Sequence, residues 1–308
     1  MKYYVNGKSE FNGSGSIENP FRTIQQAALI ALPGDEVLVY PGIYRESINP
    51  KHAGTEQNRI VYRSLEKLGA HITGAETIKN WVNIKDNVWT VSIPNGFFGS
   101  FNPFSTLISG DWFFADNIAH TGDVFLNEKS MYEVTDLAQV YEPSESVNSW
   151  DKEFSVYTWL TEQDIEKKET VLYANFNGLD PNTENVEISV RKHCFYPEEE
   201  GIGFITCSGF KISQAATQWA PPTAYQEGMV GPHWSKGWII EDCEIYESKC
   251  SGISLGKYLQ KDNDNKWLKW KYKDGTQTER ECICQASYEG WDKEHIGSHI
   301  IRNCDIHD

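Results

Sequence analysis

Three short segments of the chain share one pattern, and this repeat constrains the fold more than any other feature of the sequence. The segments are ITCSGFKIS at 205–213, WIIEDCEIYE at 238–247 and HIIRNCDIHD at 299–308. Three sets of side chains align across them: Cys207 with Ile240 and Ile301, Phe210 with Cys243 and Cys304, and Ile212 with Ile245 and Ile306. A solenoid buries a continuous core by stacking residues of one kind from turn to turn. The repeat therefore predicts successive coils of a parallel β-helix.

The spacing of the repeats and their turn residues refine this prediction. The aligned positions lie 33 and 61 residues apart, which is more than one coil needs, so we expect insertions to project from the coils. Asp242 and Asn303 occupy the same position, between two of the aligned apolar residues. Asp and Asn tolerate a left-handed backbone, so we expect both residues to turn the chain from one strand into the next.

The N-terminal region shows the same winding. The run PGDEVLVYPGIYRE at 33–46 places a short apolar strand between two Pro-Gly turns. Val37 and Val39 alternate into a core, and Ile43 begins a different face, so the chain winds onward and forms no hairpin. RIVYRS at 59–64 and HITGA at 71–75 have the composition of further strands.

A cap helix is predicted ahead of these strands. Four apolar residues after Pro20 are spaced at i, i+3, i+4 and i+7, namely Ile24, Ala27, Ala28 and Ala31. This spacing predicts an amphipathic helix of about three turns that ends at Pro33-Gly34.

The middle of the chain lacks the solenoid pattern. Between residues 81 and 190 the sequence contains alternating strand-like runs with polar connections, such as FSVYTWLT and ETVLYANF. Such runs are typical of an antiparallel β-sandwich. We therefore expect three parts: a cap with the first coils at 1–78, an inserted sandwich at 79–192, and a β-helix continuation at 193–308.

Charge and composition exclude several classes of partner. The net charge is 28 − 44 = −16, which repels polyanions such as nucleic acid and anionic membranes. The N-terminus lacks the apolar core of a signal peptide, and no run approaches the ~18 apolar residues of a membrane span. Seven cysteines with no metal-binding spacing indicate free thiols in a reducing compartment, so a cytoplasmic location is expected. No P-loop, H-E-x-x-H motif or Ser-His-Asp arrangement appears, and no cofactor or metal is predicted.

Several longer motifs point to one family. The sequence contains FNPF, GDWFF, GDVFLN, LYANFNGLDPN, VEISVRKHCFYP, WAPPTAYQEGMVGPHWSKGWIIEDCEIY and CSGISLGK. Together they resemble the β-xylosidases of glycoside hydrolase family 120, nearly end to end. The resemblance implies a right-handed parallel β-helix and a retaining hydrolase that removes xylose from neutral xylo-oligosaccharides. It also suggests a homo-oligomer.

The catalytic residues are not assigned within this sequence. A retaining glycosidase needs two carboxyl groups about 5–5.5 Å apart. By resemblance the family members are about twice as long, and their catalytic Asp and Glu lie in later coils. The chain stops inside a repeat, so we expect it to be an N-terminal portion whose catalytic pair lies beyond Asp308.

Candidate substrate-binding residues lie in two regions. In the insert, the resemblance gives Trp112 as an aromatic lent to the sugar subsite, and Asp111 could bind a sugar hydroxyl. Packing in the sandwich core and a turn after Gly110 are the respective structural alternatives. In the long loop between two coils, four residues are candidates to stack on or hydrogen-bond a neutral sugar: Trp219, Gln226, Trp234 and Lys236. His233 and Lys257 are further candidates, and simple shielding of the coil by the loop is the alternative.

Two other functions stay open. A polysaccharide lyase can use the same fold, because fold does not fix function. The charge of −16 and the absence of a basic cluster in the long loop argue against it. A non-catalytic carbohydrate-binding β-helix module is the third interpretation.

Overall fold

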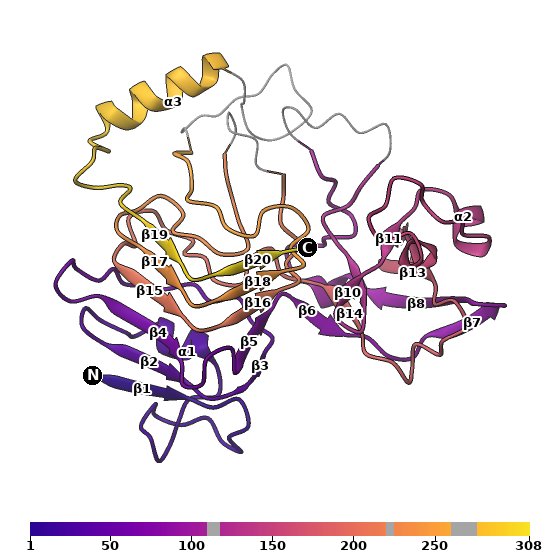
Figure 1. Cartoon of the computed structure of the whole chain (residues 1–308), viewed down its shortest axis with the longest axis horizontal. Helices are drawn as coiled ribbons and strands as arrows, with labels where there is room; N and C mark the ends of the chain where they lie inside the picture. Colours follow the sequence, from indigo (N-terminus) through magenta and orange to yellow (C-terminus); the bar gives the residue numbers. More distant parts are fainter. Residues whose placement is uncertain (110–117, 220–224, 260–275) are drawn as a thin grey trace. The chain divides into compact units, whose positions relative to one another are not determined.

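The computed structural model describes all residues except 110–117, 220–224 and 260–275, and it is mostly β-structure (Figure 1). The chain forms two units. The first contains Met1–Gly74, Ser109 and the described part of Lys192–Asp308. The second contains Ala75–Ile108 and the described residues up to Arg191.

The first unit is built on two parallel sheets. The first sheet has the order β1-β2-β4-β15-β17-β19. Its strands are Lys2–Val5, Glu36–Val39, Ile60–Ser64, Ile205–Ser208, Ile239–Glu241 and Ile300–Arg302. The second sheet has the order β3-β5-β16-β18-β20. Its strands are Gly42–Tyr44, Ala70–Thr73, Lys211–Ser213, Glu244–Tyr246 and Asp305–His307.

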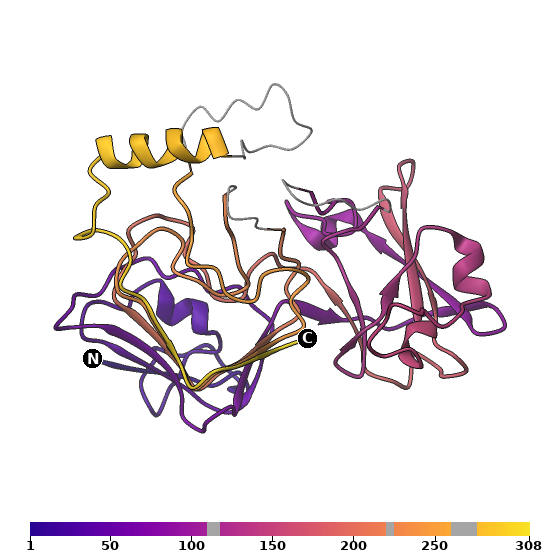
Figure 2. The same ribbon diagram turned by 45° about the horizontal axis from the view of Figure 1, so that its top comes forward.

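From β2 onward, the strands of the first unit alternate between these two sheets along the chain. β2 is followed by β3, β15 by β16 and β17 by β18, and none of these pairs forms a hairpin. Figure 2 shows the paired strands superposed, with each passage of the chain bending from one sheet into the other. The prediction that the Pro-Gly turns carry the chain onward is confirmed.

The predicted register of the repeats is confirmed. Cys207 pairs with Ile240, and Ile240 pairs with Ile301. In the other parallel sheet, Ile212, Ile245 and Ile306 pair in the same way. One hydrophobic cluster, drawn from both sheets and from the cap, fills the interior of the unit.

The turn between the two sheets uses left-handed residues, as predicted. Asp242 and Asn303 have φ values of 55° and 53°, and Gly209 takes the same place in the repeat with φ 76°. Residues that reach this conformation at low cost are therefore found at the turn in all three repeats.

The cap helix is shorter than predicted. Helix α1 spans Ile24–Ala28, which is little more than one turn rather than about three. Thr23 caps it, and its amide protons are further bound by Glu46, whose carboxylate accepts from Ile24 and Gln25 at 2.8 Å each. Ala31 is nevertheless buried with the rest of the predicted apolar face. After Ala28 the backbone bonding is mixed, because the Ala27 carbonyl accepts from Ile30, three residues on, and from Ala31, four residues on.

The strand predicted at 71–75 is divided in the structure. β5 ends at Thr73, and β6, Ala75–Thr77, belongs to the second unit. A Cβ atom on Gly74 would lie 2.7 Å from Ala215 Cα, so the backbones approach too closely there for any side chain. The strand pattern in the sequence continues across this glycine, but the sheet does not.

The second unit has two further sheets. The first, β10-β9-β14-β6, is antiparallel; its other strands are Lys129–Ser130, Val124–Leu126 and Val186–Ser189. The second has the order β11-β12-β13-β8-β7 and is antiparallel except between β11 and β12. Its strands are Tyr132–Glu133, Thr158–Asp164, Glu169–Asn175, Val88–Pro94 and Val82–Lys85. Both sheets contribute to one buried cluster that contains Trp159, Phe104 and Phe176.

Short helices complete the structure. In the second unit, α2 is Leu137–Tyr141, and two 3₁₀ helices are Asn95–Phe98 and Phe154–Val156. In the first unit, α3 is Thr276–Tyr288. Among the described residues, no helix combines the length and the apolar character needed to cross a membrane.

Candidate functional site

Isolated parallel bridges form a third ladder in the first unit. Ile48 bridges to Phe195, Phe195 to Val230, and Val230 to Ile253. A backbone hydrogen bond supports the ladder: the N–H of Cys194 donates to the Met229 carbonyl at 2.9 Å. A cluster of polar side chains lies on the residues beside it. Loops that leave a rigid ladder are where binding side chains are commonly held.

Three rings are stacked beside this ladder. The ring of His193 stacks on Tyr196 with centroids 4.4 Å apart, and Tyr196 stacks on His233 at 5.2 Å. Tyr196 and His233 are buried. The stack therefore presents imidazole and phenol groups on a rigid base.

Hydrogen bonds orient both histidines. The Tyr225 hydroxyl lies 2.7 Å from Nε2 of His233, and Nδ1 of His233 lies 3.0 Å from the Pro197 carbonyl. Because a carbonyl only accepts, Nδ1 carries the proton and Nε2 accepts from Tyr225 when His233 is neutral. Nδ1 of His193 donates in the same way to the Gly228 carbonyl at 2.8 Å.

A charged pair lies at one end of the stack. Lys192 and Glu227 form an ion pair, and the second oxygen of Glu227 is 3.9 Å from Nε2 of His193. Glu227 is the carboxylate that lies beside His193 in this cluster. One carboxylate with a paired lysine can bind a hydroxyl group, but it does not supply the two carboxyl groups of a retaining glycosidase.

Burial holds both histidines neutral near pH 7. Desolvation lowers the pKa of His193 to about 4, even though Glu227 acts in the opposite direction. Desolvation also lowers the pKa of His233. Neutral imidazoles can both donate and accept, so the cluster suits an uncharged ligand with several hydroxyl groups.

Two buried polar atoms in this region lack a partner among the described residues. They are the hydroxyl of Tyr196 and Nε1 of Trp234. The Tyr225 hydroxyl is near enough to raise the pKa of Tyr196 further, after desolvation, but it does not meet hydrogen-bond geometry with it. Unsatisfied buried groups are rare, and functional sites are one place where they occur.

Trp234, predicted from the sequence, belongs to an aromatic cluster beside the stack. Its ring lies 6.2 Å from that of Trp291 and 6.3 Å from that of Tyr258. Tyr258 in turn donates to Glu289 on the segment after α3, at 2.8 Å. The chain after α3 therefore contacts the loop that carries Trp234.

The other predicted residues are dispersed around this cluster. Gln226 lies between Tyr225 and Glu227 in the chain and is half-buried. Trp219 is half-buried, and its backbone N–H donates to the side-chain carbonyl of Gln218. The same oxygen accepts from the backbone N–H of Ser109 at 3.0 Å. The ammonium of Lys236 instead donates to the backbone carbonyl of Lys293.

Two predicted residues cannot be placed, and several cluster residues were not predicted. Asp111 and Trp112 lie outside the described residues. The roles of His193, Tyr196, Tyr225 and Glu227 were missed, although KHCFYP and AYQEG stood among the family-like motifs. A polar residue beside a short apolar run is a weak signal, since its partner comes from another winding of the chain.

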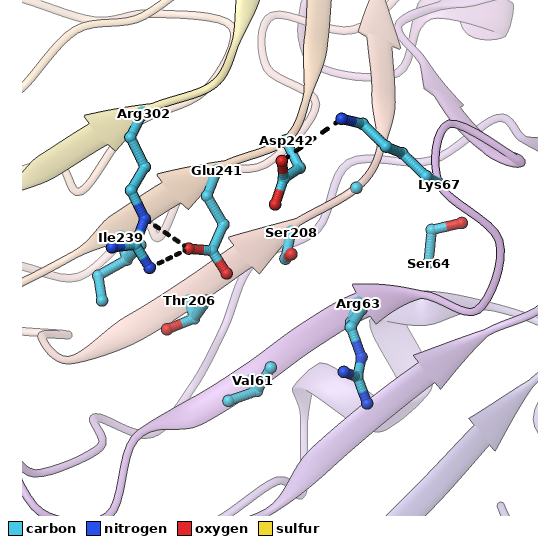
Figure 3. A pocket seen from close by; sticks show the side chains of 11 residues that line it. Val61, Arg63, Ser64, Lys67, Thr206, Ser208, Ile239, Glu241, Asp242 and Arg302 are labelled. Carbon is cyan, nitrogen blue, oxygen red and sulfur yellow. Dashed lines mark hydrogen bonds and ion pairs between the residues drawn. The ribbon is translucent and has the colours of Figure 1, made fainter.

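A separate hollow of about 550 Å³ lies on the outer face of the first parallel sheet (Figure 3). In register across the strands, the small Ser208 lies between Arg63 and Glu241. Arg302 donates to Glu241 at 2.6 and 2.9 Å, and Lys67 pairs with Asp242 at 3.4 Å. These rim charges neutralise one another, so the polar cluster at the third ladder is the better candidate site.

The described residues contain no group of three or more His, Cys, Asp or Glu side chains placed to hold a metal ion.

Two comparisons with known proteins relate the chain to glycoside hydrolases. Residues 78–188 match the family model described as "Glycoside hydrolase 120, insertion domain". The solved structure titled "The complex structure of XylC with xylose" is 43% identical over the whole chain, with a TM-score of 0.90. A region of the chain therefore matches the family 120 insertion domain, and the whole chain is similar to half of XylC.

The matches cover only part of each relative. This chain covers 50% of the XylC chain. The uncharacterized protein YwoF of Bacillus subtilis (strain 168) is 34% identical over 77 residues, which are 25% of this chain and 16% of YwoF. A solved structure named "Glycoside hydrolase" is 12% identical with a TM-score of 0.46, over 82% of this chain and 63% of that one. The region that matches the insertion-domain model, residues 78–188, overlaps the second unit, although Ser109 belongs to the first.

Proposed function

We propose that the chain forms part of a retaining exo-β-xylosidase that removes xylose from neutral xylo-oligosaccharides. The observation that carries this proposal is the match of the entire chain to XylC, whose structure was solved with xylose. The neutral, hydroxyl-binding chemistry of the polar cluster and the acidic composition of the chain support the same conclusion.

In this proposal the two parallel sheets and the third ladder are the faces of a right-handed parallel β-helix. The two sheets of the second unit form a β-sandwich inserted between its coils. Alternation of consecutive strands between sheets, in register, supports the first part, and the shared cluster of the second unit supports the other. The domain limits 1–78, 79–192 and 193–308 are part of the same proposal.

The sugar is proposed to bind at the cluster beside the third ladder. There Trp234 and Trp219 offer aromatic faces, Gln226 offers a donor and an acceptor, and Glu227 accepts from sugar hydroxyls. Asp111, Trp112 and Lys236 remain proposed contributors. One cluster carboxylate is too few for retention, so we propose that the catalytic pair comes from the half of the XylC-like fold that this chain does not cover.

Calorimetric titration of the 308-residue chain with xylose tests the binding site. We expect millimolar binding without turnover, weakened about threefold to tenfold by Gln226→Ala, because one hydrogen bond contributes about 0.5–1.5 kcal/mol. Tyr288→Ala is the matched control, since Tyr288 is 92% exposed on α3. Equal affinity in all three proteins would place the sugar elsewhere.

An aryl β-xyloside tests the catalytic assignment. Release of the aryl group by this chain would show that a working carboxylate pair lies within it. Proton NMR of the first xylose released by a full-length family 120 enzyme with this N-terminal sequence should show the β-anomer. An unsaturated product that absorbs in the ultraviolet would instead indicate a lyase.

A further inference from the structure

The second unit displays one tryptophan entirely to solvent. Trp150 has a relative exposure of 105%, and Val147 on the same loop is 80% exposed. Large aromatic side chains bury most of their surface in ordinary folded proteins. A single exposed indole does not by itself define a binding site, so its position beside a polar pocket is what gives it significance.

The loop that carries Trp150 is anchored on both sides of it. The hydroxyl of Ser149 is hydrogen-bonded to Tyr132 and accepts from the N–H of Asp151 at 3.0 Å. Asp151 forms an ion pair with Lys129 and accepts from the N–H of Phe154 at 3.1 Å. Both neighbours of Trp150 are therefore held in place, which fixes the backbone position from which the indole projects.

The same loop borders a pocket of about 310 Å³ within the second unit. The pocket is lined by Tyr132, Glu133, Val134, Gln139, Glu142, Pro143, Ser144, Ser146, Ser155 and Thr158. Trp150 follows Ser146 by four residues, and Tyr132 is the residue that holds Ser149. The exposed indole and the pocket thus share one structural support.

The pocket wall is rigid and contains no cationic side chain. Ser155 and Thr158 are both 3% exposed. Ser155 accepts from the N–H of Ser146 at 2.8 Å, and Thr158 donates to the Gln139 carbonyl at 3.3 Å. Of the two lining carboxylates, Glu133 is bound by the N–H and Nδ1 of His120. Hydroxyl, amide and carboxylate groups without a cation favour a neutral ligand with many hydroxyl groups and disfavour an anion.

We propose that Trp150 and this pocket form a carbohydrate-binding site in the insertion domain for a neutral oligosaccharide. One sugar ring lays its apolar C–H face on the indole, and a neighbouring unit inserts hydroxyl groups among the pocket residues. The site is separate from the cluster at the third ladder, and it binds without hydrolysis. Its role rests on the proposed function, and it would hold the enzyme near the xylan from which its oligosaccharide substrates come.

Affinity electrophoresis of the full chain in gels containing soluble arabinoxylan, followed by titration with xylotetraose, tests the proposal. Trp150→Ala should raise the Kd about fivefold or more, because a central aromatic anchor typically contributes over 1 kcal/mol. Trp150→Tyr keeps an aromatic face and should restore most of the affinity. Glu142→Gln should retain binding, because the ligand is neutral and the amide still offers an acceptor. Loss of xylotetraose binding in Glu142→Gln would show that binding requires the carboxylate charge, and it would overturn the proposed neutral recognition.

Matched variants separate this site from the one in the first unit. Tyr288→Ala removes an exposed aromatic of the other unit and should bind arabinoxylan as the wild type does. Gln226→Ala should weaken xylose binding and leave retention in the gel unchanged. If Trp150→Ala migrates as the wild type, the insertion-domain site is wrong while the first-unit site still stands. If Trp150→Ala instead changes only the sedimentation coefficient, Trp150 contacts a second copy of the chain and the carbohydrate site is equally excluded.

Discussion

The hydroxyl of Tyr225 lies 2.7 Å from Nε2 of His233, eight residues farther along the chain. This contact fixes the tautomer of a buried imidazole, because Nδ1 of the same ring faces the Pro197 carbonyl. It also joins Tyr225, on the loop between β16 and β17, to the ring stack of His193, Tyr196 and His233. The polar cluster therefore depends on one phenol for its geometry.

Removing this phenol should loosen the cluster. Tyr225→Phe leaves Nε2 of His233 without its donor, and an unsatisfied buried acceptor costs about 1–3 kcal/mol. We expect the free energy of unfolding to fall by about that amount in urea denaturation, and xylose binding to weaken. Tyr288→Phe, on the exposed face of α3, is the control and should leave both quantities unchanged. Wild-type stability in Tyr225→Phe would show that the hydrogen bond does not matter.

The buried histidines should make the protein lose stability in mild acid. The pKa of His193 is about 4 in the folded chain and 6.5 when unperturbed, so the unfolded state binds more protons between these values. Stability is therefore retained above pH 6.5 and falls as the pH decreases toward 4. The cost for His193 approaches about 3 kcal/mol at the lower limit.

Urea midpoints measured from pH 7.5 to pH 4.5 check this expectation. His193→Gln should flatten the curve, because glutamine has no proton to gain. His52→Gln, at an exposed position, should reproduce the wild-type slope. A wild-type midpoint that does not change over this range would contradict the burial argument.

The cysteines should differ sharply in reactivity. Cys284 is exposed, whereas Cys194, Cys207 and Cys243 are buried. A hydrogen bond to Cys207 and burial raise the pKa of the Cys243 thiol. Because the thiolate is the reactive form, iodoacetamide should label Cys284 first and leave Cys194, Cys207 and Cys243 unlabelled in the native protein. Peptide mass spectrometry gives the order of labelling. Early labelling of Cys243 would show that the core between the two parallel sheets is accessible to the reagent.

The turn between the two parallel sheets offers a test of backbone strain. Asp242 has φ 55°, a conformation that is costly for a β-branched residue. Asp242→Val should destabilise the protein by about 1–3 kcal/mol. Asp242→Gly should change stability by less than about 1 kcal/mol, because it removes only an exposed ion pair with Lys67. Equal losses in the two variants would show that the side chain, and not the backbone, matters at this turn.

The core could be predicted from the sequence because its signal is local and repeated. Cys243 and Ile245 align with their counterparts by simple counting, and the structure stacks them as expected. The length of the cap helix could not be predicted, since the apolar face reaches Ala31 while the helix ends at Ala28. A pattern of burial does not say which backbone hydrogen bonds will close the last turn.

The candidate site could be predicted only in part. Trp234 and Gln226 stood out because loop residues able to stack on or hydrogen-bond a sugar are recognisable by type. His193, Tyr196 and Glu227 did not, because each gains its role from a partner on another winding of the chain: Tyr196 stacks on His233, and His193 bonds Gly228. Trp150 was not predicted either, since exposure of one side chain cannot be read from its neighbours in sequence.

By itself the sequence determined which side chains face a common interior, where the chain turns, and which family the protein resembles. Short-range periodicity and backbone preference decide these properties, so they can be read along the chain. The tertiary structure alone decided which polar residues meet, which imidazoles lose water and stay neutral, and which indole remains outside. Those outcomes depend on distances between residues far apart in sequence and on the solvent that folding removes between them.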